Sequence, residues 1–202
     1  MIKAITFDLD GVYFPNSCKE SFMAKIVAMG VSEAEVRRVF YQSDEMNEQY
    51  KLGKIGDEEF WSWAADEWGV NLSPADLLHL LLDCYQPDEK VAETVRKVRA
   101  AGYKTLVCSN NFPGRVLGLQ KKFGFLDDFD GTAFSYILGV QKPSKEIFQA
   151  LIDVAGAEPE EIIYSDDNAD RLGGADELGI KTFVYKDFSQ FEQELANFGV
   201  IY

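Results

Sequence analysis

Residues 2–11 read IKAITFDLDG, and this stretch decides the fold. Its first part, Ile2–Phe7, is a short apolar run of residues that favour β-structure, which predicts a buried strand. The run ends in a polar turn, Asp8-Leu9-Asp10-Gly11. Gly11 suits a tight turn because glycine adopts backbone conformations that other residues avoid. In open α/β sheets ligands bind beyond the carboxyl ends of the strands, so we expect chemistry at this turn.

Strand and helix patterns alternate in the second part of the chain. A helix is expected from about Asp88 to Ala101, before Gly102. Repetition of strand and helix implies a parallel sheet with helices on both faces, so the fold class is α/β with a Rossmann-like core. The later predicted strands are Lys104–Cys108, Gly131–Tyr136, Glu161–Tyr164 and Lys181–Tyr185, and the predicted helices between them are 115–123, 145–155 and 169–178.

The stretch from Ser17 to Tyr85 has helical patterns only. Ser32-Glu33-Ala34-Glu35 is a capping box that predicts a helix through about Tyr50. Asp57 is expected to cap a second helix, and Ser73-Pro74 opens a third. We therefore expect a small all-helical cap inserted after the first strand. The predicted boundaries are 16–85 for the cap and 1–15 with 86–202 for the core.

The composition excludes several classes of protein. The chain has 202 residues, of which 47% are hydrophobic, so it suits one domain with a small insert. Its net charge of -14 repels nucleic-acid phosphates and anionic lipid, and neither is an expected partner. No charged-then-apolar leader opens the chain, and the scattered Cys18, Cys84 and Cys108 fit reduced thiols, so a cytoplasmic location is expected. A small anionic substrate would need local cations, either a metal or a placed lysine.

Polar side chains follow each of the first four predicted strands. Because the strand ends meet at one edge of the sheet, these groups are expected to converge. Four carboxylates beside one lysine repel one another unless a cation holds them together, and oxygen ligands select a hard ion, commonly Mg²⁺. In strand order the groups are Asp8 and Asp10, then Ser109 and Asn110, then Lys142, and finally Asp166 and Asp167.

A phosphoryl group is the reacting group that fits this set. Its transfer needs an in-line nucleophile, neutralisation of charge on the equatorial oxygens, and a proton for the leaving oxygen. A carboxylate can act as the nucleophile and form an aspartyl-phosphate. A second carboxyl can give a proton to the leaving alcohol and later take one from water.

Each segment also has an ordinary explanation. Asp-x-Asp-Gly is a frequent turn sequence, and Ser109 can cap a helix. Lys142 before Pro143 can be a solvated lysine, and Asp166-Asp167-Asn168 can be an N-cap cluster. The functional interpretation depends on their joint placement after successive strands.

The motifs together resemble the haloacid dehalogenase superfamily, most closely its phosphatases with a helical cap inserted after the first strand. The resemblance covers nearly the whole chain, with the motifs in the expected order. The cap segment GKIGDEEFW, Gly53–Trp61, is similar to the short four-helix caps of the sugar-phosphate phosphatase branch. The motifs are FDLDGVYF from Phe7 to Phe14, LVCSNN from Leu106 to Asn111, GVQKPSKEIF from Gly139 to Phe148, and IIYSDDNADRLGGADELGI from Ile162 to Ile180.

By matching position, the resemblance implies catalytic roles. Asp8 would be the nucleophile, and Asp10 would be the general acid and base. Ser109 would hydrogen-bond the transferring phosphoryl group with help from Asn110. Lys142 would neutralise charge on the nucleophile and on the phosphoryl oxygens. The dehalogenating relatives lack a carboxylate at the position of Asp10, because a halide leaves without a proton, so its presence favours phosphoryl chemistry.

The resemblance also implies a magnesium site. Asp8 would bind Mg²⁺ through its side chain, and Asp10 through its backbone carbonyl. Asp167 would bind the ion directly, whereas Asp166 would bind it either directly or through water.

The leading hypothesis is a Mg²⁺-dependent phosphatase acting on a small phosphorylated metabolite, either a sugar phosphate or a nucleotide. A phosphosugar mutase would use the same intermediate but return the phosphoryl group to a sugar. A phospho-receiver or a degenerate binding protein would not turn substrate over, and the helical insert with its late Asp166-Asp167 pair argues against a receiver. Monomer and homodimer are both compatible with the sequence.

Three kinds of further side chain are considered next: one arginine, the single histidine and polar residues of the cap. Arg115 is expected on a helix surface, although it is also a candidate for meeting a substrate anion. His79, the single histidine, is expected on the surface of a helix. From the cap, Glu45, Tyr50 and Lys54 are the candidates for reaching the substrate.

Overall fold

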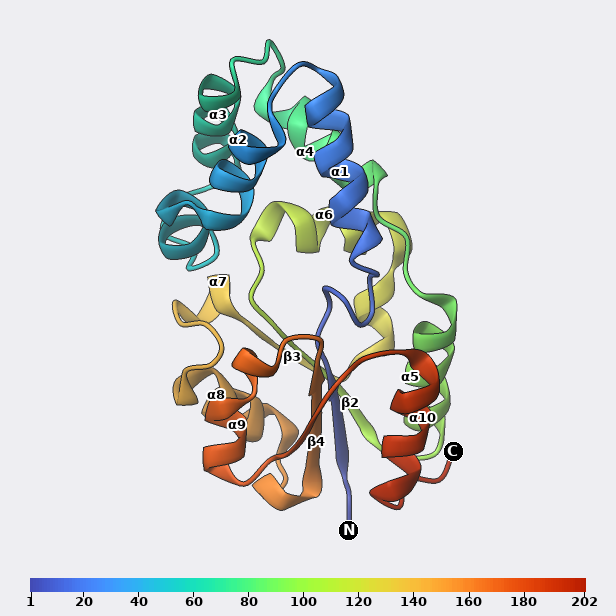
Figure 1. Cartoon of the computed structure of the whole chain (residues 1–202). Helices are drawn as coiled ribbons and strands as arrows, with labels where there is room; N and C mark the ends of the chain where they lie inside the picture. The colour runs from blue at the N-terminus through green and yellow to red at the C-terminus, as the bar shows by residue number, and fades with distance from the viewer.

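The computed structural model describes residues 1–202, which form a parallel sheet below a group of helices (Figure 1). The sheet has five strands in the order β3-β2-β1-β4-β5, and every neighbouring pair is parallel. The α/β class is confirmed, and all five predicted strands are present, although the third ends at Phe134 and not at Tyr136. The strands are β1 (Ala4–Phe7), β2 (Lys104–Ser109), β3 (Gly131–Phe134), β4 (Ile162–Asp166) and β5 (Lys181–Val184).

The strand β1 lies at the centre of the sheet, and all its residues are buried. At its carboxyl end, Phe7 pairs with Val107 of β2 on one side and with Ser165 of β4 on the other. The carboxyl ends of these three strands therefore lie side by side. Both chain termini lie at the opposite end of the molecule, away from the upper helices (Figure 1).

Helices cover both faces of the sheet, as predicted. On one face, α5 (Glu89–Ala100) and α10 (Phe188–Asn197) pack against Phe7 and its neighbours. On the other face, α8 (Lys145–Ala155) and α9 (Gly173–Leu178) pack against Ala4 and Leu106. The remaining elements of the core are α6 (Pro113–Phe123), η3 (Phe125–Asp128), α7 (Ser135–Leu138), η4 (Pro159–Glu161) and η5 (Ala169–Arg171).

Two details of the core differ from the sequence prediction. The helix predicted over 169–178 begins as the 3₁₀ turn η5 and becomes α-helical only at Gly173, because the Asn168 side chain accepts a hydrogen bond from Asp170 N and caps a separate turn. The helix α10 was not predicted at all. It is capped by Asp187, whose side chain accepts a hydrogen bond from Gln190 N.

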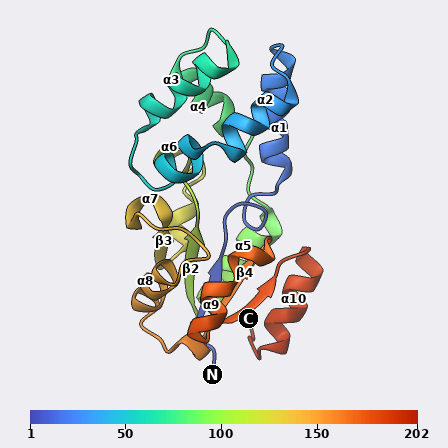
Figure 2. The ribbon, with the colours of Figure 1, turned by 60° about the vertical axis from the view of Figure 1, so that its left-hand side comes forward.

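The chain between β1 and α5 is entirely helical, as predicted, and stands above the carboxyl ends of the strands (Figures 1 and 2). No helix of the molecule combines the length and the apolar character needed to cross a membrane. The elements of this insert are α1 (Ser17–Ala28), α2 (Glu33–Arg37), the π-helical turns η1 (Arg38–Gln42) and η2 (Glu45–Tyr50), α3 (Asp57–Trp68) and α4 (Pro74–Asp83).

The single helix predicted from Ser32 to about Tyr50 is wrong, because the chain breaks at Ser43. Ser43 is extended, with ψ of 150°. Its hydroxyl donates to Val39 O at 2.6 Å and accepts from Met46 N at 3.1 Å. A serine side chain that bonds the backbone on both sides competes with the regular helix ladder, and here it starts a new helical turn.

The predicted capping role of Asp57 is also wrong, and the actual role links the insert to the core. The N-cap of α3 is Gly56. The Asp57 carboxylate instead accepts hydrogen bonds from the Tyr50 hydroxyl and, at 2.9 Å, from Gly114 N in the first turn of α6. The Tyr50 ring stacks on Phe112 with 4.4 Å between centroids, so buried apolar packing runs from the insert into the core without a break.

Candidate active site

The strand order brings the predicted site residues together. Asp8 directly follows the central strand β1, while Ser109 ends β2 and Asp166 ends β4 on either side of it. Lys142 approaches from the loop between α7 and α8. These groups line a polar cavity of about 220 Å³, called here the outer chamber, and its wall has no hydrophobic residue. The lining residues are Asp8, Asp10, Lys19, Lys51, Ser109, Asn110, Lys142, Asp166, Asp167, Asn168 and Arg171.

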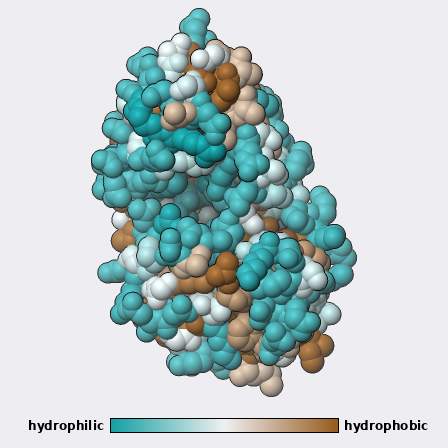
Figure 3. Space-filling model, in the orientation of Figure 1, coloured by the Kyte–Doolittle hydropathy of each residue, from teal (hydrophilic) through white to brown (hydrophobic).

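The space-filling view shows a hollow between the insert and the core, with mostly hydrophilic residues around it (Figure 3). The insert is held over this region by polar contacts with the core. The Ser135 hydroxyl donates to Lys51 O at 2.6 Å, and Asn16 Nδ2 donates to an Asp167 oxygen at 2.7 Å. The outer chamber is therefore a cavity between the two parts of the chain.

Lys142 is the buried cation of the outer chamber, and its side chain is 2% exposed. Its ammonium lies 3.0 Å from Asp8 Oδ1 and 2.6 Å from Asp166 Oδ2. It also donates to the Tyr164 hydroxyl at 2.8 Å and to Cys108 O at 3.1 Å. The carboxylates of Asp8 and Asp166 raise the pKa of Lys142 against the opposing effect of burial, so Lys142 is a fixed positive charge at neutral pH.

Asp8 is the least satisfied carboxylate of the site. Its buried Oδ1 has the Lys142 ammonium, at 3.0 Å, as its one ion-pair partner. Burial raises the pKa of Asp8 to about 6 against the lowering effect of Lys142, and the negative charges of Asp166 and Asp10 add to the rise. A desolvated carboxylate with so few partners is poised to attack an electrophile or to bind a cation.

The acidic cluster fits a divalent metal ion. Asp8, Asp166 and Asp167 each place one carboxylate oxygen within 4.8 Å of the others. Hard oxygen ligands of this kind suit Mg²⁺. Asp166 is already engaged: one of its oxygens bonds Lys142 and Tyr164, and the other accepts from Asn168 N at 2.9 Å. Asp167 makes only the bond from Asn16, which leaves it freer to contact an ion.

Ser109 and Asn110 differ in how available they are. Ser109 is buried in the wall of the outer chamber, and its hydroxyl has only a long contact of 3.5 Å with Asn111 Nδ2. The amide of Asn110 is paired with the backbone of Lys142, accepting from Lys142 N at 2.8 Å and donating to Lys142 O at 3.1 Å. Asn110 therefore positions the Lys142 loop, whereas the Ser109 hydroxyl is available to a ligand.

Gly11 is required where the loop passes the acidic cluster. Its φ is +82°, and a Cβ built there would lie 2.1 Å from Asp167 Oδ2. We expect Gly11→Ala to displace the Asp167 carboxylate and to lower the affinity for Mg²⁺ by roughly 10- to 100-fold. Thermal unfolding at a series of Mg²⁺ concentrations measures this affinity.

The matched control for this substitution is Gly102→Ala. Gly102 has a φ of +96°, but nothing lies within 4 Å of its added Cβ. This variant carries only the backbone cost, on the order of 1–2 kcal/mol of stability. Equal Mg²⁺ affinity in the two variants would contradict the placement of Asp167 at the ion.

Arg115 is not on a helix surface, and that prediction is wrong. The residue is 3% exposed, and its guanidinium contacts Asp10 Oδ2 at 2.5 Å. It also donates to the Tyr85 hydroxyl at 2.9 Å and to Asn111 Oδ1 at 2.8 Å. Helical spacing placed Arg115 on α6 correctly. The amino terminus of α6 points beneath the insert, however, so the first turn of this helix is covered.

The ion pair between Arg115 and Asp10 controls the charge of Asp10. Burial alone would raise the pKa of Asp10, but the Arg115 guanidinium, with Lys19 and Lys51, lowers it below its ordinary value. Lys19 Nζ lies 3.4 Å from Asp10 Oδ2. Asp10 is therefore held as a carboxylate, the form that accepts a proton.

A second, smaller cavity of about 40 Å³ continues from the outer chamber and is called here the inner chamber. Asp10, Lys19 and Lys51 line both chambers. Burial, together with repulsion from Arg115 and Lys19, lowers the pKa of Lys51 to about 7. The residues that line the inner chamber are Asp10, Lys19, Phe40, Tyr41, Met46, Lys51, Phe112 and Arg115.

The cap residues that reach the chambers are not the predicted ones. Lys54 is exposed, Glu45 lines neither chamber, and Tyr50 is buried against Asp57. Lys19 and Lys51 take their place. Lys19 had a usable signal, because it lies in the first turn of the helix that directly follows the Asp8–Gly11 turn. For Lys51 the sequence held no such signal, because its place depends on the break at Ser43, after which the segment that carries Lys51 starts a new helical turn.

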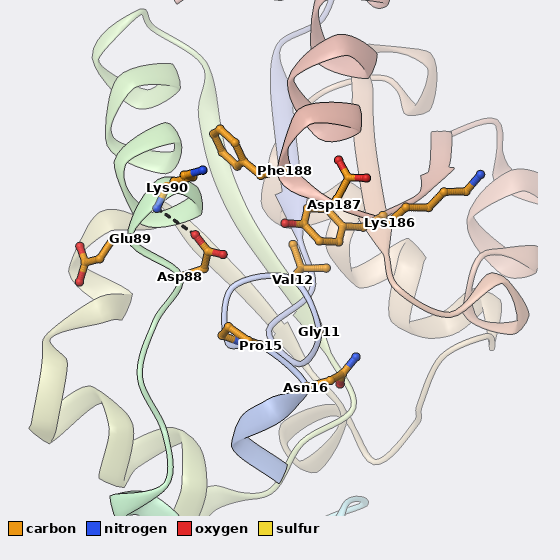
Figure 4. A pocket seen from close by; sticks show the side chains of 11 residues that line it. Gly11, Val12, Pro15, Asn16, Asp88, Glu89, Lys90, Lys186, Asp187 and Phe188 are labelled. Atoms are coloured by element: carbon orange, nitrogen blue, oxygen red, sulfur yellow. Dashed lines mark hydrogen bonds between the residues drawn. The ribbon is translucent and has the colours of Figure 1, made fainter. Parts of the chain in front are cut away.

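The largest cavity of the molecule, about 570 Å³, is a different one (Figure 4). It neighbours the site through Gly11 and Asn16. The Asp88 side chain in its wall caps α5 by accepting a hydrogen bond from Lys90 N at 2.9 Å, and Asp187 likewise caps α10. These carboxylates cap helices, and no buried polar side chain lines the cavity. The largest cavity is therefore not the candidate active site.

Comparison with known proteins gives a family match. The sequence pattern of the haloacid dehalogenase-like hydrolases matches residues 2–179. A D-ribitol-5-phosphate phosphatase of Bacteroides thetaiotaomicron is 25% identical over 202 aligned residues, covering 97% of this chain and 98% of that protein.

Solved structures give the same picture. A haloacid dehalogenase family enzyme from Bacteroides thetaiotaomicron, in complex with magnesium and inorganic phosphate, superimposes with a TM-score of 0.76 at 25% identity, covering 95% of this chain and 99% of that one. An L-2-haloacid dehalogenase from Xanthobacter autotrophicus gives a TM-score of 0.67 at 21% identity, covering 100% of this chain and 85% of that one, which shows the shared fold.

Proposed function

Because this chain belongs to the haloacid dehalogenase-like hydrolase family, as its motifs predicted, we propose that it is a magnesium-dependent phosphatase acting on a small phosphate monoester. One observation carries the proposal. Asp8 is buried, its Oδ1 lies 3.0 Å from the Lys142 ammonium, and one of its oxygens lies within 4.8 Å of carboxylate oxygens of Asp166 and Asp167. A nucleophile, a fixed cation and a metal-binding cluster thus share one chamber.

The proposed reaction has two halves. First, a carboxylate oxygen of Asp8 attacks phosphorus, the bond from phosphorus to the leaving oxygen breaks, and Asp10 gives that oxygen a proton. Water then attacks the phosphorus of the aspartyl-phosphate, Asp10 takes a proton from the water, and the bond to Asp8 breaks to release phosphate. The ion pair with Arg115 favours the charged form of Asp10, which is the form needed for the attack of water. In the first half Asp10 has to carry a proton, so this ion pair has to loosen there.

The remaining residues have supporting roles in this proposal. Lys142 neutralises charge that develops on the phosphoryl oxygens, and the Ser109 hydroxyl donates to one of them. Asp8 and Asp167 would hold Mg²⁺ through side-chain oxygens, Asp10 would hold it through its backbone carbonyl, and Asp166 would do so directly or through water. A bound Mg²⁺ supplies positive charge that draws the phosphoryl group and Asp8 together.

We further propose that residues 16–85 act as a cap over a core formed by 1–15 and 86–202. The contacts of Asp57 with Gly114 and of Ser135 with Lys51 support a closed arrangement. Closure would exclude bulk water from the aspartyl-phosphate and select the leaving group.

The relative that acts on D-ribitol-5-phosphate supports a phosphorylated sugar or polyol as the general kind of substrate. A nucleotide is the other small monoester that the site chemistry allows. A phosphosugar mutase remains the second candidate function, because Asp8 and Asp10 would serve it equally. Membership in a hydrolase family argues against a phospho-receiver or a binding protein.

The proposal is tested by phosphate release. With Mg²⁺ present, the protein is expected to release inorganic phosphate over many turnovers from a panel of sugar, polyol and nucleotide monoesters, without added sugar bisphosphate. Colorimetric phosphate detection measures the rate. A requirement for a bisphosphate, with isomerised sugar phosphate as the product, would replace the hydrolase by the mutase. A protein that keeps one phosphoryl group per chain would be a receiver.

A further inference from the structure

The inner chamber has more basic side chains than its carboxylate can pair with. Lys19, Lys51 and Arg115 line it, whereas Asp10 is its one acidic residue. Asp10 Oδ2 already contacts Arg115 at 2.5 Å and Lys19 at 3.4 Å. The polar part of this chamber therefore favours an anion over a neutral group.

Lys51 is the basic side chain of this chamber that has no charged partner. Its Nζ donates at 3.0 Å to Asn47 Oδ1, a neutral amide oxygen, and no carboxylate lies within ion-pair distance. Its backbone carbonyl is held by the Ser135 hydroxyl at 2.6 Å. The core thus holds the backbone of Lys51 beside the chamber, and Asn47 holds its ammonium.

The inner chamber adjoins the place where the leaving oxygen of the proposed substrate would be protonated. In the proposed reaction Asp10 gives its proton to the leaving oxygen, and Asp10 lines both chambers. The inner chamber is therefore next to the atoms beyond that oxygen and available to them.

The size and walls of the inner chamber restrict what enters. Its volume of about 40 Å³ is roughly three times the ~10–15 Å³ that one water needs, which suits a carboxylate better than a sugar ring. Phe40, Tyr41, Met46 and Phe112 form the rest of its wall. An apolar wall leaves the charged side chains as the main polar partners of the group inside.

We propose that the leaving group of the substrate carries a carboxylate, so that the substrate class is a phosphorylated hydroxy acid, and that Lys51 is the residue that selects for it, together with Lys19. The inference rests on the proposed phosphatase function. A leaving group with a carboxylate differs from ribitol, the neutral polyol in the name of the D-ribitol-5-phosphate phosphatase.

The test compares esters that differ only in charge. Phosphorylated hydroxy acids with two to four carbons are assayed against their neutral carboxamides, which keep the shape of the molecule and remove the charge. Wild type is expected to favour the acid by about 30-fold or more in kcat/KM for at least one chain length, because losing one partner of a buried charge pair costs that much.

The variant Lys51→Met separates charge from packing, because methionine keeps most of the apolar stem. The ratio of kcat/KM for acid over amide is expected to fall by about tenfold or more. Lys54→Met is the matched control, since Lys54 is exposed three residues away and lines neither chamber, and its ratio is expected to equal that of wild type. Calorimetric binding of acid and amide to Asp8→Asn gives the same comparison without turnover.

The outcomes separate the two proposals. Equal rates for acids and amides, or an unchanged ratio in Lys51→Met, would overturn the carboxylate inference and leave the phosphatase intact. If wild type releases phosphate from no ester, including p-nitrophenyl phosphate with Mg²⁺, the phosphatase proposal falls and takes the inference with it.

Discussion

Asp8→Asn is expected to lower phosphate release by about 10⁴-fold or more, the largest effect of any single substitution in this chain. An amide oxygen at this position is a poor nucleophile and cannot form the aspartyl-phosphate. The measurement is the Mg²⁺-dependent rate with the best ester of the panel. Asp44→Asn is the matched control, because Asp44 is an exposed aspartate whose side chain makes no hydrogen bond, and wild-type activity is expected there.

The same substitution is expected to stabilise the metal-free protein. The pKa of Asp8 rises from 3.8 to about 6 on folding, so the folded chain holds this proton more tightly than the unfolded chain. Stability from this group is complete below pH 4 and is lost as pH rises through 6. The loss at pH 7.5 is on the order of 3 kcal/mol, and Asp8→Asn avoids it.

Thermal unfolding in chelator checks this expectation. Asp8→Asn should unfold at a higher temperature than wild type at pH 7.5, and the gap should close near pH 4. Retained Mg²⁺-dependent turnover in the variant would refute the nucleophile assignment. An inactive variant that unfolds well below wild type at pH 7.5 would mean that Asp8 stabilises the fold instead.

Removing the metal is expected to have the second largest effect. In excess chelator the rate of phosphate release should fall by roughly 10³-fold or more, since the charge that Mg²⁺ supplies is worth several kcal/mol in the transition state. Adding Mg²⁺ beyond the chelator should restore the rate. Full activity in excess chelator would remove the ion from the mechanism.

Binding of the ion can be measured without turnover. A ligand that binds only the folded protein stabilises it by about 2.7 kcal/mol at a concentration of 100 times its Kd. Mg²⁺ should therefore raise the unfolding temperature of wild type, and Asp167→Asn should need a much higher concentration for the same rise. Asp170→Asn is the control, because Asp170 is exposed and its side chain makes no hydrogen bond, while its backbone N donates to Asn168 Oδ1. Equal responses of the two variants would exclude Asp167 as a ligand.

Two features of the chain depend on tertiary packing and on a local side-chain bond that the helical period does not encode. Arg115 was placed on the correct helix, but its burial depends on how the first turn of α6 lies beneath the insert, which no local pattern encodes. Ser43 was taken as an interior helix residue. Its hydroxyl bonds the backbone on both sides and breaks the helix, which brings Lys51 to the chamber.

The strands, the helical insert and the residues at the strand ends, from Asp8 to Asp167, could all be predicted from the sequence. These follow from local hydrophobic period and turn chemistry, and the parallel sheet then aligns the carboxyl ends. Only the tertiary structure decided the partners of the carboxylates, such as Arg115 for Asp10, and the cations of the inner chamber. Charge pairing depends on distances between residues remote in the chain, and those distances exist only after the insert packs on the core.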